Sequence, residues 1–325
     1  MYKEFFGLTD YPFSLTPDPK FLVATPGYNE LLAGLYCGIE MAKGLIILTG
    51  EVGTGKTTAL RWMIRRLDSS VLASYLFNPH LSIEEFYHHL GNSFEIKDWS
   101  NKSSLLLKLG KLCEDRHRRG LRTMLIVDEA HELSDELLEE IRLLLNFESD
   151  NAKHLQIILA GQPELRDRLR QHNQRQLKQR VALSCKMPSL ESVRDVGSYI
   201  TERLKIAGSV NPNIFSAAAI DLVFQCSEGI PRQINNLCDN AMIAGYASNV
   251  RVIGRAIVEE TAKELDLLPD RGTLLASVNG VDIVTTAQVL SKIGREELLT
   301  ELNPRAGRQT VKRKPRNPNG SGEKA

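Results

Sequence analysis

The chain has 325 residues, of which 42% are hydrophobic, and a net charge of +1, so its length suggests roughly two domains and its charge indicates no class of partner. No apolar run approaches the ~18 residues of a membrane span, and the start MYKEFFGLTDYPF lacks the features of a signal peptide, so we expect a cytoplasmic protein without a transmembrane segment. The five cysteines never form CxxC, which favours reduced thiols over disulfides or a metal site.

Strands and helices alternate through the first half of the chain. Helices are expected at 56–67 and 102–119, and Ser82 with Glu85 three residues later forms a capping box that predicts a further helix start. Short apolar runs separated by helices predict a mostly parallel sheet covered on both faces, an α/β fold. The five expected strands are 45–49, 71–77, 123–127, 155–160 and 181–185.

After residue 188 the pattern becomes purely helical, with breaks at 208–212, at 229–231 and around Asn249. This predicts a compact all-helical second domain. From residue 303 onward the chain is rich in Pro, Gly, Asn and basic residues, which is typical of a disordered tail. The expected helices of the second domain are 193–207, 214–227, 232–246 and 255–265.

The stretch GEVGTGKTT at 50–58 lies between the first expected strand and a helix and matches GxxxxGK[ST]. Glycines let backbone N–H groups turn inward around phosphate oxygens, and the helix start adds its positive end. Lys56 is expected to contact the β and γ phosphates of ATP, and the Thr57 hydroxyl to bind Mg²⁺. The alternative is an ordinary glycine-rich turn, but such a turn does not need to lie between a strand and a helix. The predicted nucleotide-binding residues are Gly50, Glu51, Val52, Gly53, Thr54, Gly55, Lys56, Thr57, Thr58 and Arg232.

The segment LIVDEAH at 125–131 supplies the expected second half of the site. Asp128 ends an apolar strand, where its carboxylate can hold Mg²⁺, and Glu129 can accept a proton from an attacking water. The alternative is an acidic helix start, which the helix dipole favours. A helicase family also contains DEAH, but it needs two tandem nucleotide-type domains, so we treat His131 as incidental. The expected reaction is hydrolysis of the β–γ bond.

Three further polar residues distinguish among phosphate-loop proteins. Gln162 follows an expected strand, where it could sense the γ-phosphate or simply form a turn. Arg180 precedes the last strand and could reach a phosphate in an adjacent subunit, and the alternative for it and for Arg175 is a solvated basic face. Arg232 stands in the first turn of a helix that Pro231 starts, either as a lid arginine or as a plain helix start.

At these residues the sequence resembles the AAA+ ATPases, and within them the branch of the secretion ATPase ExeA (GspA, general secretion pathway protein A) and the pilus-biogenesis ATPase MshM. The resemblance covers 1–268 and implies an AAA+ type P-loop NTPase, with a small helical lid domain after the sheet. It is carried, in order, by FGLTDYPFSLTPDPKFL, GEVGTGKTT, VDEAHEL, IRLLLNFES, ILAGQPEL, LKQRV and GIPRQINNLCDNA.

Residue by residue, the resemblance implies roles for the polar positions. Sensor 1 is often Asn, Ser or Thr in that family, whereas the region here reads Ala-Gly-Gln. The resemblance implies Walker A at 50–57, Walker B at Asp128 and Glu129, sensor 1 near Gln162, an arginine finger at Arg180 and sensor 2 at Arg232. It also implies that Asn78 restrains Glu129 until a partner binds. The expected divisions are an N-terminal family segment at 1–27, the nucleotide-binding domain at 28–187, the helical lid at 188–268, a helical extension at 269–303 and a basic tail at 304–325.

The expected function is an ATP-hydrolysing switch, a homo-oligomer that assembles or remodels a secretion or pilus complex. ExeA-like proteins continue into a membrane span and a peptidoglycan-binding region; this chain shows neither, so we expect the periplasmic part of that task to be absent. One alternative is a DNA-associated ATPase resembling the TnsC and TniB transposition or origin-recognition ATPases, and another is an ATP-binding scaffold with little turnover. The basic cluster VKRKPR at 311–316 could bind nucleic acid or anionic lipid, or only solvate the tail.

Overall fold

The computed structural model describes residues 2–16, 18–78, 80–211 and 213–268, which belong to one compact unit spanning 1–268. The helical extension and basic tail expected at 269–325 lie outside the described residues. Among the described residues, no helix is both long and apolar enough to cross a membrane.

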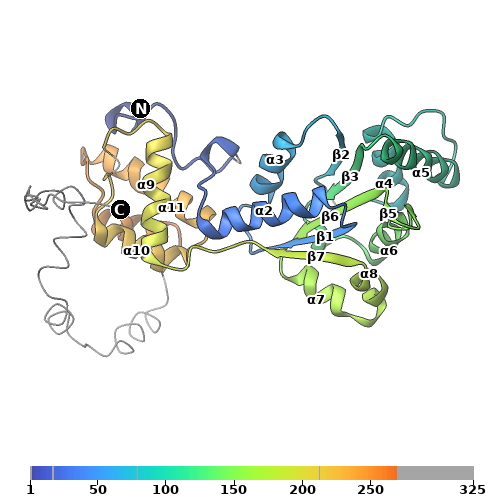
Figure 1. Ribbon diagram of the computed structural model, residues 1–325. Helices are drawn as coiled ribbons and strands as arrows, with labels where there is room; N and C mark the ends of the chain where they lie inside the picture. The colour runs from blue at the N-terminus through green and yellow to red at the C-terminus, as the bar shows by residue number, and fades with distance from the viewer. Residues whose placement is uncertain (1, 17, 79, 212, 269–325) are drawn as a thin grey trace, which may run out of the picture. The chain divides into compact units, whose positions relative to one another are not determined.

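A five-stranded parallel sheet forms the centre of the first half of the chain, which confirms the predicted fold class (Figure 1). The strand order is β2-β3-β6-β1-β7. Every residue of β1 and β6 is buried, as expected for strands covered on both faces, whereas β7 at one edge alternates between partly buried and exposed residues. The strands are β1 Leu45–Thr49, β2 Val71–Leu76, β3 Arg122–Val127, β6 Leu155–Gly161 and β7 Val181–Lys186.

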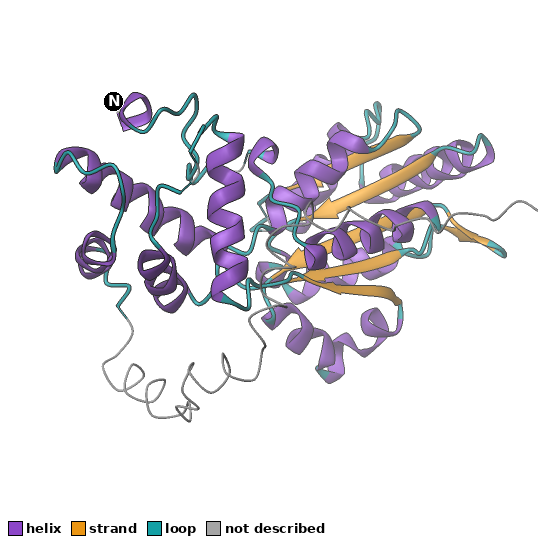
Figure 2. Cartoon of the chain, turned by 60° about the vertical axis from the view of Figure 1, so that its left-hand side comes forward, coloured by secondary structure: helices purple, strands orange, loops and turns teal. Residues whose placement is uncertain are grey.

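Helices cover both faces of this sheet (Figure 2). On one face α2 and α3 bury apolar residues such as Leu35 and Leu60, and on the other α4, α5 and α6 bury residues such as Phe86, Leu109 and Ile141. These helices are α2 Pro26–Glu40, α3 Lys56–Arg66, α4 Ile83–Ser93, α5 Lys102–Arg118 and α6 Asp135–Leu144. Short elements complete the domain: η2 Ala130–Glu132, α7 Glu164–Arg170, η3 His172–Gln174 and α8 Arg175–Gln179.

In this half one local prediction is confirmed and one small element was not expected. The predicted capping box at the start of α4 is present, with both Ser82 and Glu85 in their expected hydrogen bonds. A small antiparallel hairpin of β4 Glu148–Ser149 and β5 Ala152–Lys153 was not expected. Each of its strands has only two residues and no apolar alternation, so it leaves no periodic signal in the sequence.

The helical domain consists of four helices around a separate core. Buried residues such as Ile200, Val223 and Leu237 form its centre. Its helices are α9 Val193–Ile206, α10 Ala217–Ser227, α11 Pro231–Ala247 and α12 Arg255–Glu264, all at the positions that the apolar spacing predicts.

The N-terminal segment packs into the core of the helical domain. Tyr2, Phe13 and Phe21 belong to the same apolar cluster as the four helices, and α1 (Tyr2–Phe5) and η1 (Pro19–Phe21) lie in this segment. The backbone N–H of Thr9 donates to the carbonyl of Ala207 at 2.8 Å. The chain therefore begins in the helical domain, crosses to the sheet at α2, and returns after β7.

Candidate functional site

The phosphate loop connects the carboxyl end of β1 to α3. Gly53 and Gly55 have φ values of +81° and +96°, in the left-handed region where a side chain is strained. Gly55 is also the N-cap of α3 and offers no side chain to its first N–H groups. These N–H groups and the positive helix end therefore remain available to an anion.

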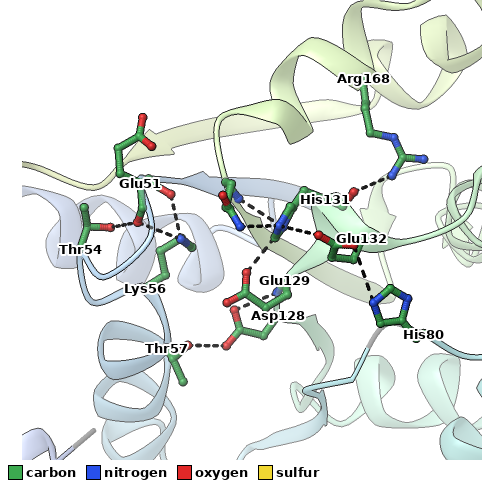
Figure 3. A network of polar contacts seen from close by, with 12 residues as sticks. Glu51, Thr54, Lys56, Thr57, His80, Asp128, Glu129, His131, Glu132 and Arg168 are labelled. Carbon is green, nitrogen blue, oxygen red and sulfur yellow. Dashed lines mark hydrogen bonds and ion pairs between the residues drawn. The ribbon is translucent and has the colours of Figure 1, made fainter. Parts of the chain in front are cut away.

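Lys56 is the first residue of α3 and is buried. Its ammonium donates to the carbonyls of Gly50 at 2.8 Å and Glu51 at 3.1 Å, so the side chain lies along its own loop (Figure 3). Burial lowers the pKa of the Lys56 ammonium, and the nearby carboxylates of Glu129 and Asp128 oppose that shift. A phosphate in the loop would offer this cation stronger acceptors than two neutral carbonyls.

Asp128 follows β3 and is almost fully buried. One carboxylate oxygen accepts from the Thr57 hydroxyl and from the Tyr75 hydroxyl, each at 2.7 Å, and the other accepts from the N–H of Glu129 at 3.0 Å. A hydroxyl and a carboxylate side by side fit Mg²⁺, which prefers oxygen ligands and keeps several waters. These residues therefore fit the predicted metal set of Thr57 and Asp128.

Tyr75 is a component of the site that sequence reasoning missed. It lies on β2, in register with Ile126 of β3, and so reaches the carboxylate at the end of the neighbouring strand. Burial and the hydrogen bond to Asp128 both raise the pKa of its hydroxyl, which keeps the group a donor. Only the adjacency of β2 and β3 could have indicated this contact.

Glu129 adopts a backbone conformation that is uncommon for its residue type. Its φ of 49° and ψ of 37° fall in the left-handed region, and non-glycine residues held there cluster at functional sites. Its side chain lines the cavity, and its Oε2 atom is buried without a hydrogen bond among the described residues. The Nδ1 atom of His131 lies 3.5 Å from Oε2. A carboxylate oxygen with free lone pairs is suited to accept a proton.

Gln162 follows β6 and also lines the cavity. Its amide nitrogen lies 2.7 Å from Nε2 of His131. His131, which the sequence reading treats as incidental, therefore contacts both Glu129 and Gln162.

Asn78 follows β2 but the structure does not bring it to Glu129. Its side chain is exposed, and its amide oxygen accepts from the N–H of His80 at 3.2 Å. No contact between Asn78 and Glu129 occurs in the described part of the chain, because Asn78 caps its own loop. The predicted restraint of Glu129 by Asn78 therefore has no geometric support in this state.

Arg232 brings the helical domain onto the phosphate loop. Pro231 occupies the first turn of α11, as predicted, and the N–H of Arg232 donates to the carbonyl of Gly53 at 3.1 Å. The Arg232 guanidinium lines the cavity and has no hydrogen bond or ion pair with any described residue. It is available to a phosphate.

Arg180 lies at the amino end of the parallel strands, whereas the phosphate loop lies at their carboxyl end. It directly precedes β7, whose first residue Val181 pairs with Leu45 at the start of β1. Its guanidinium lies 3.4 Å from the carbonyl of Leu145 and 3.7 Å from the carboxylate of Glu148. Arg180 does not line the cavity of its own chain, so its predicted role as an arginine finger requires a second copy of the chain.

A cavity of about 390 Å³ lies over the phosphate loop, between the N-terminal segment and the helical domain. The predicted residues that line it are Val52, Gly53, Thr54, Gly55, Lys56, Thr57, Thr58, Glu129, Gln162 and Arg232, while Gly50, Glu51, Asp128, Asn78 and Arg180 do not. Sequence reasoning missed the opposite wall, which includes Phe21, Tyr28 and Tyr199. The Tyr28 hydroxyl is buried without a partner among the described residues, so it can bond to a ligand.

Known proteins support this reading of fold and relationship. Residues 39–169 match the AAA domain family. Over 294 residues the chain is 38% identical to general secretion pathway protein A of Aeromonas hydrophila, in a match that covers 88% of this chain and 53% of that relative. This chain thus spans about half the length of the relative. The predicted resemblance is confirmed.

Two solved structures share the fold. Cdc6p of Pyrobaculum aerophilum is similar with a TM-score of 0.60 and 16% identity, over 80% of this chain and 72% of that one. The Drosophila origin recognition complex (ORC) bound to DNA contains a chain with a TM-score of 0.56 and 19% identity, over 88% of this chain and 70% of that one. At these identities the likeness establishes the fold alone.

Proposed function

Since the chain contains an AAA domain and is a relative of general secretion pathway protein A, we propose that it binds ATP with Mg²⁺ and hydrolyses the β–γ bond to assemble or remodel a protein complex. The observation that carries the proposal is the position of Glu129. Its unbonded carboxylate oxygen lies beside Asp128, and Glu129 lines the same cavity as Lys56 and Thr57.

The chain's own residues divide the work of hydrolysis. The N–H groups of the loop and Lys56 hold the phosphates, and Glu129 accepts a proton from the attacking water. Thr57 and Asp128 would hold Mg²⁺, which when bound neutralises charge on the β and γ phosphates. Gln162 faces the same cavity and orients the water, and Arg232 binds phosphate from the helical domain.

Glu129→Gln tests the hydrolytic step. We expect a loss of about 100-fold or more in the ATPase rate with ATP binding retained, because an amide cannot accept the proton. Glu136→Gln, at an exposed position on α6, is a control with the same change of charge and should keep the wild-type rate. A rate unaffected by Glu129→Gln would instead favour an ATP-binding scaffold.

We further propose that hydrolysis is coupled to assembly of identical subunits on a protein partner of secretion or pilus type, on the cytoplasmic side where ATP is available. The location of Arg180 away from its own cavity supports a role in a neighbouring copy. A guanidinium placed there would neutralise charge in the transition state.

Size measurement of Glu129→Gln protein by light scattering tests this coupling. We expect an assembly that forms only with ATP and Mg²⁺ and that is lost when Arg180→Ala is added. Arg170→Ala, which removes an exposed arginine paired with Asp167, is the matched control and should preserve the assembly. A strict monomer under every condition would contradict the proposal.

A DNA-associated ATPase is the second candidate. It is favoured by the fold shared with an ORC chain from a DNA-bound structure, and by the basic cluster at 311–316. In that case duplex DNA should stimulate hydrolysis, with a steep loss of stimulation between about 50 mM and 200 mM salt as counterions compete. Hydrolysis that is indifferent to DNA at all salt concentrations would eliminate this candidate.

A further inference from the structure

We propose that His131 is a positioning residue, which holds the carboxylate of Glu129 and links it to the cavity-facing amide of Gln162. The inference rests on the proposed hydrolytic function and adds to it the way the general base is oriented. It is drawn from the contacts of the His131 ring (Figure 3).

The first observation is that the ring of His131 bridges the other two side chains. Nε2 lies 2.7 Å from the side-chain amide nitrogen of Gln162, and Nδ1 lies 3.4 Å from the backbone nitrogen of Gln162. Nδ1 also lies 3.5 Å from Oε2 of Glu129. The imidazole therefore lies between Gln162 and the Glu129 carboxylate and contacts both.

The second observation is that the His131 side chain is buried whereas the Glu129 side chain is partly exposed. The His131 side chain is 8% exposed and that of Glu129 is 44% exposed. Arg168 of α7 fixes the turn by donating to the carbonyls of His131 at 2.8 Å and Leu133 at 2.5 Å. A buried ring in contact with a more exposed carboxylate is the arrangement expected of an orienting group.

The third observation is the close approach of the His131 turn to β6. A Cβ atom on Gly161 would lie 3.0 Å from the backbone nitrogen of His131 and 3.4 Å from its Nδ1. Glycine at the end of β6 therefore leaves room for the ring directly beside Gln162. Glu132 also faces the ring, with Oε1 3.2 Å from Nε2, but its side chain is 48% exposed and does not line the cavity.

These contacts indicate how the cavity communicates with the base. A γ-phosphate that engages the Gln162 amide changes the hydrogen bond to Nε2 of His131. The contact between the His131 ring and the Glu129 carboxylate then changes, and the carboxylate turns toward the attacking water. The coupling runs through adjacent side chains over the ends of β3 and β6, within one subunit.

Two substitutions separate the two ring nitrogens. In His131→Asn the short amide can occupy the Nδ1 position beside Glu129, whereas in His131→Gln the longer amide can occupy the Nε2 position beside Gln162. We expect kcat to fall about tenfold or more in His131→Gln with the KM for ATP unchanged, and His131→Asn to recover part of that loss. His80→Gln, an exposed histidine 3.7 Å from Glu132, is the control and should leave kcat unchanged.

A double variant distinguishes positioning from a merely structural role. If His131 acts through Glu129, adding His131→Gln to Glu129→Gln should not lower the residual rate further. Thermal unfolding and nucleotide binding should match the wild type in both single variants. A wild-type kcat in His131→Gln, or full additivity with Glu129→Gln, would overturn the inference. Failure of Glu129→Gln itself to reduce hydrolysis would instead refute the proposed function.

Discussion

Arg203 should be a major source of stability for the cavity wall, and Arg203→Met tests this directly. The residue is 7% exposed and lies on α9. Its guanidinium donates to the carbonyl of Pro12 at 2.5 Å, to that of Phe21 at 3.2 Å and to the hydroxyl of Tyr199 at 3.0 Å. Methionine keeps most of the apolar volume but leaves these three acceptors without their donors.

The magnitude follows from these contacts. Buried polar groups left unpaired cost about 1–3 kcal/mol each, and losing one side of a buried charged network costs about 3–5 kcal/mol in total. We take about 3 kcal/mol, the lower end of the range for such a network. For a protein of this size that corresponds to a fall in Tm of roughly 6–12 °C.

The assay is thermal unfolding with and without ATP and Mg²⁺. Because Phe21 and Arg203 both line the cavity, we also expect the nucleotide-dependent rise in Tm to shrink in Arg203→Met. Arg251→Met is the matched control: Arg251 is exposed, donates to the carbonyl of Phe5 and lies over the Phe5 ring, so its loss should cost at most about 1 kcal/mol. An unchanged Tm in Arg203→Met would refute the reasoning.

Three further predictions concern the edges of the site. Gly229→Ala should destabilise the protein by about 3 kcal/mol or more, because its Cβ would lie 1.9 Å from the carbonyl oxygen of Leu190. Gly120→Ala, with a similar φ of +71° and open space around it, should cost only about 1 kcal/mol. Equal losses of stability in the two variants, measured by denaturant titration, would contradict this. Tyr75→Phe should raise the Mg²⁺ concentration for half-maximal hydrolysis about tenfold by freeing Asp128, and an unshifted Mg²⁺ titration would count against it. Arg232→Ala should weaken ATP binding about tenfold in calorimetry without changing Tm, since the backbone N–H of Arg232, which alanine keeps, makes the hydrogen bond to Gly53. Undiminished affinity would exclude the arginine from the site.

The sequence predicts the sheet well because its signal is local. Each central strand is a short run of apolar residues ended by a polar or glycine residue, so Thr49 and Asp128 are recognisable as strand ends without any tertiary information. The helical domain is equally readable from its apolar spacing. Both predictions depend only on neighbours along the chain.

The contacts missed from the sequence all depend on which segments lie side by side. Tyr75 meets Asp128 only because β2 pairs with β3, and His131 meets Gln162 only because β3 pairs with β6. The wall formed by Phe21 was missed because the aromatic residues of the N-terminal segment follow no helical or strand period. Asn78 was placed correctly at a strand end, yet its side chain turns toward His80.

The packing of the N-terminal segment on the helical domain determines how that domain can move. Two connections join it to the sheet, one leading into α2 and one leaving β7, and they meet where a Cβ on Gly27 would lie 3.3 Å from that of Pro188. Because these two connections lie side by side, the helical domain can rotate about the axis through them but is hindered from twisting about other axes. Leu22 and Pro188 also line the cavity, so a ligand bound there would lie against these two connections, where a small displacement produces the largest movement at the far end of the helices.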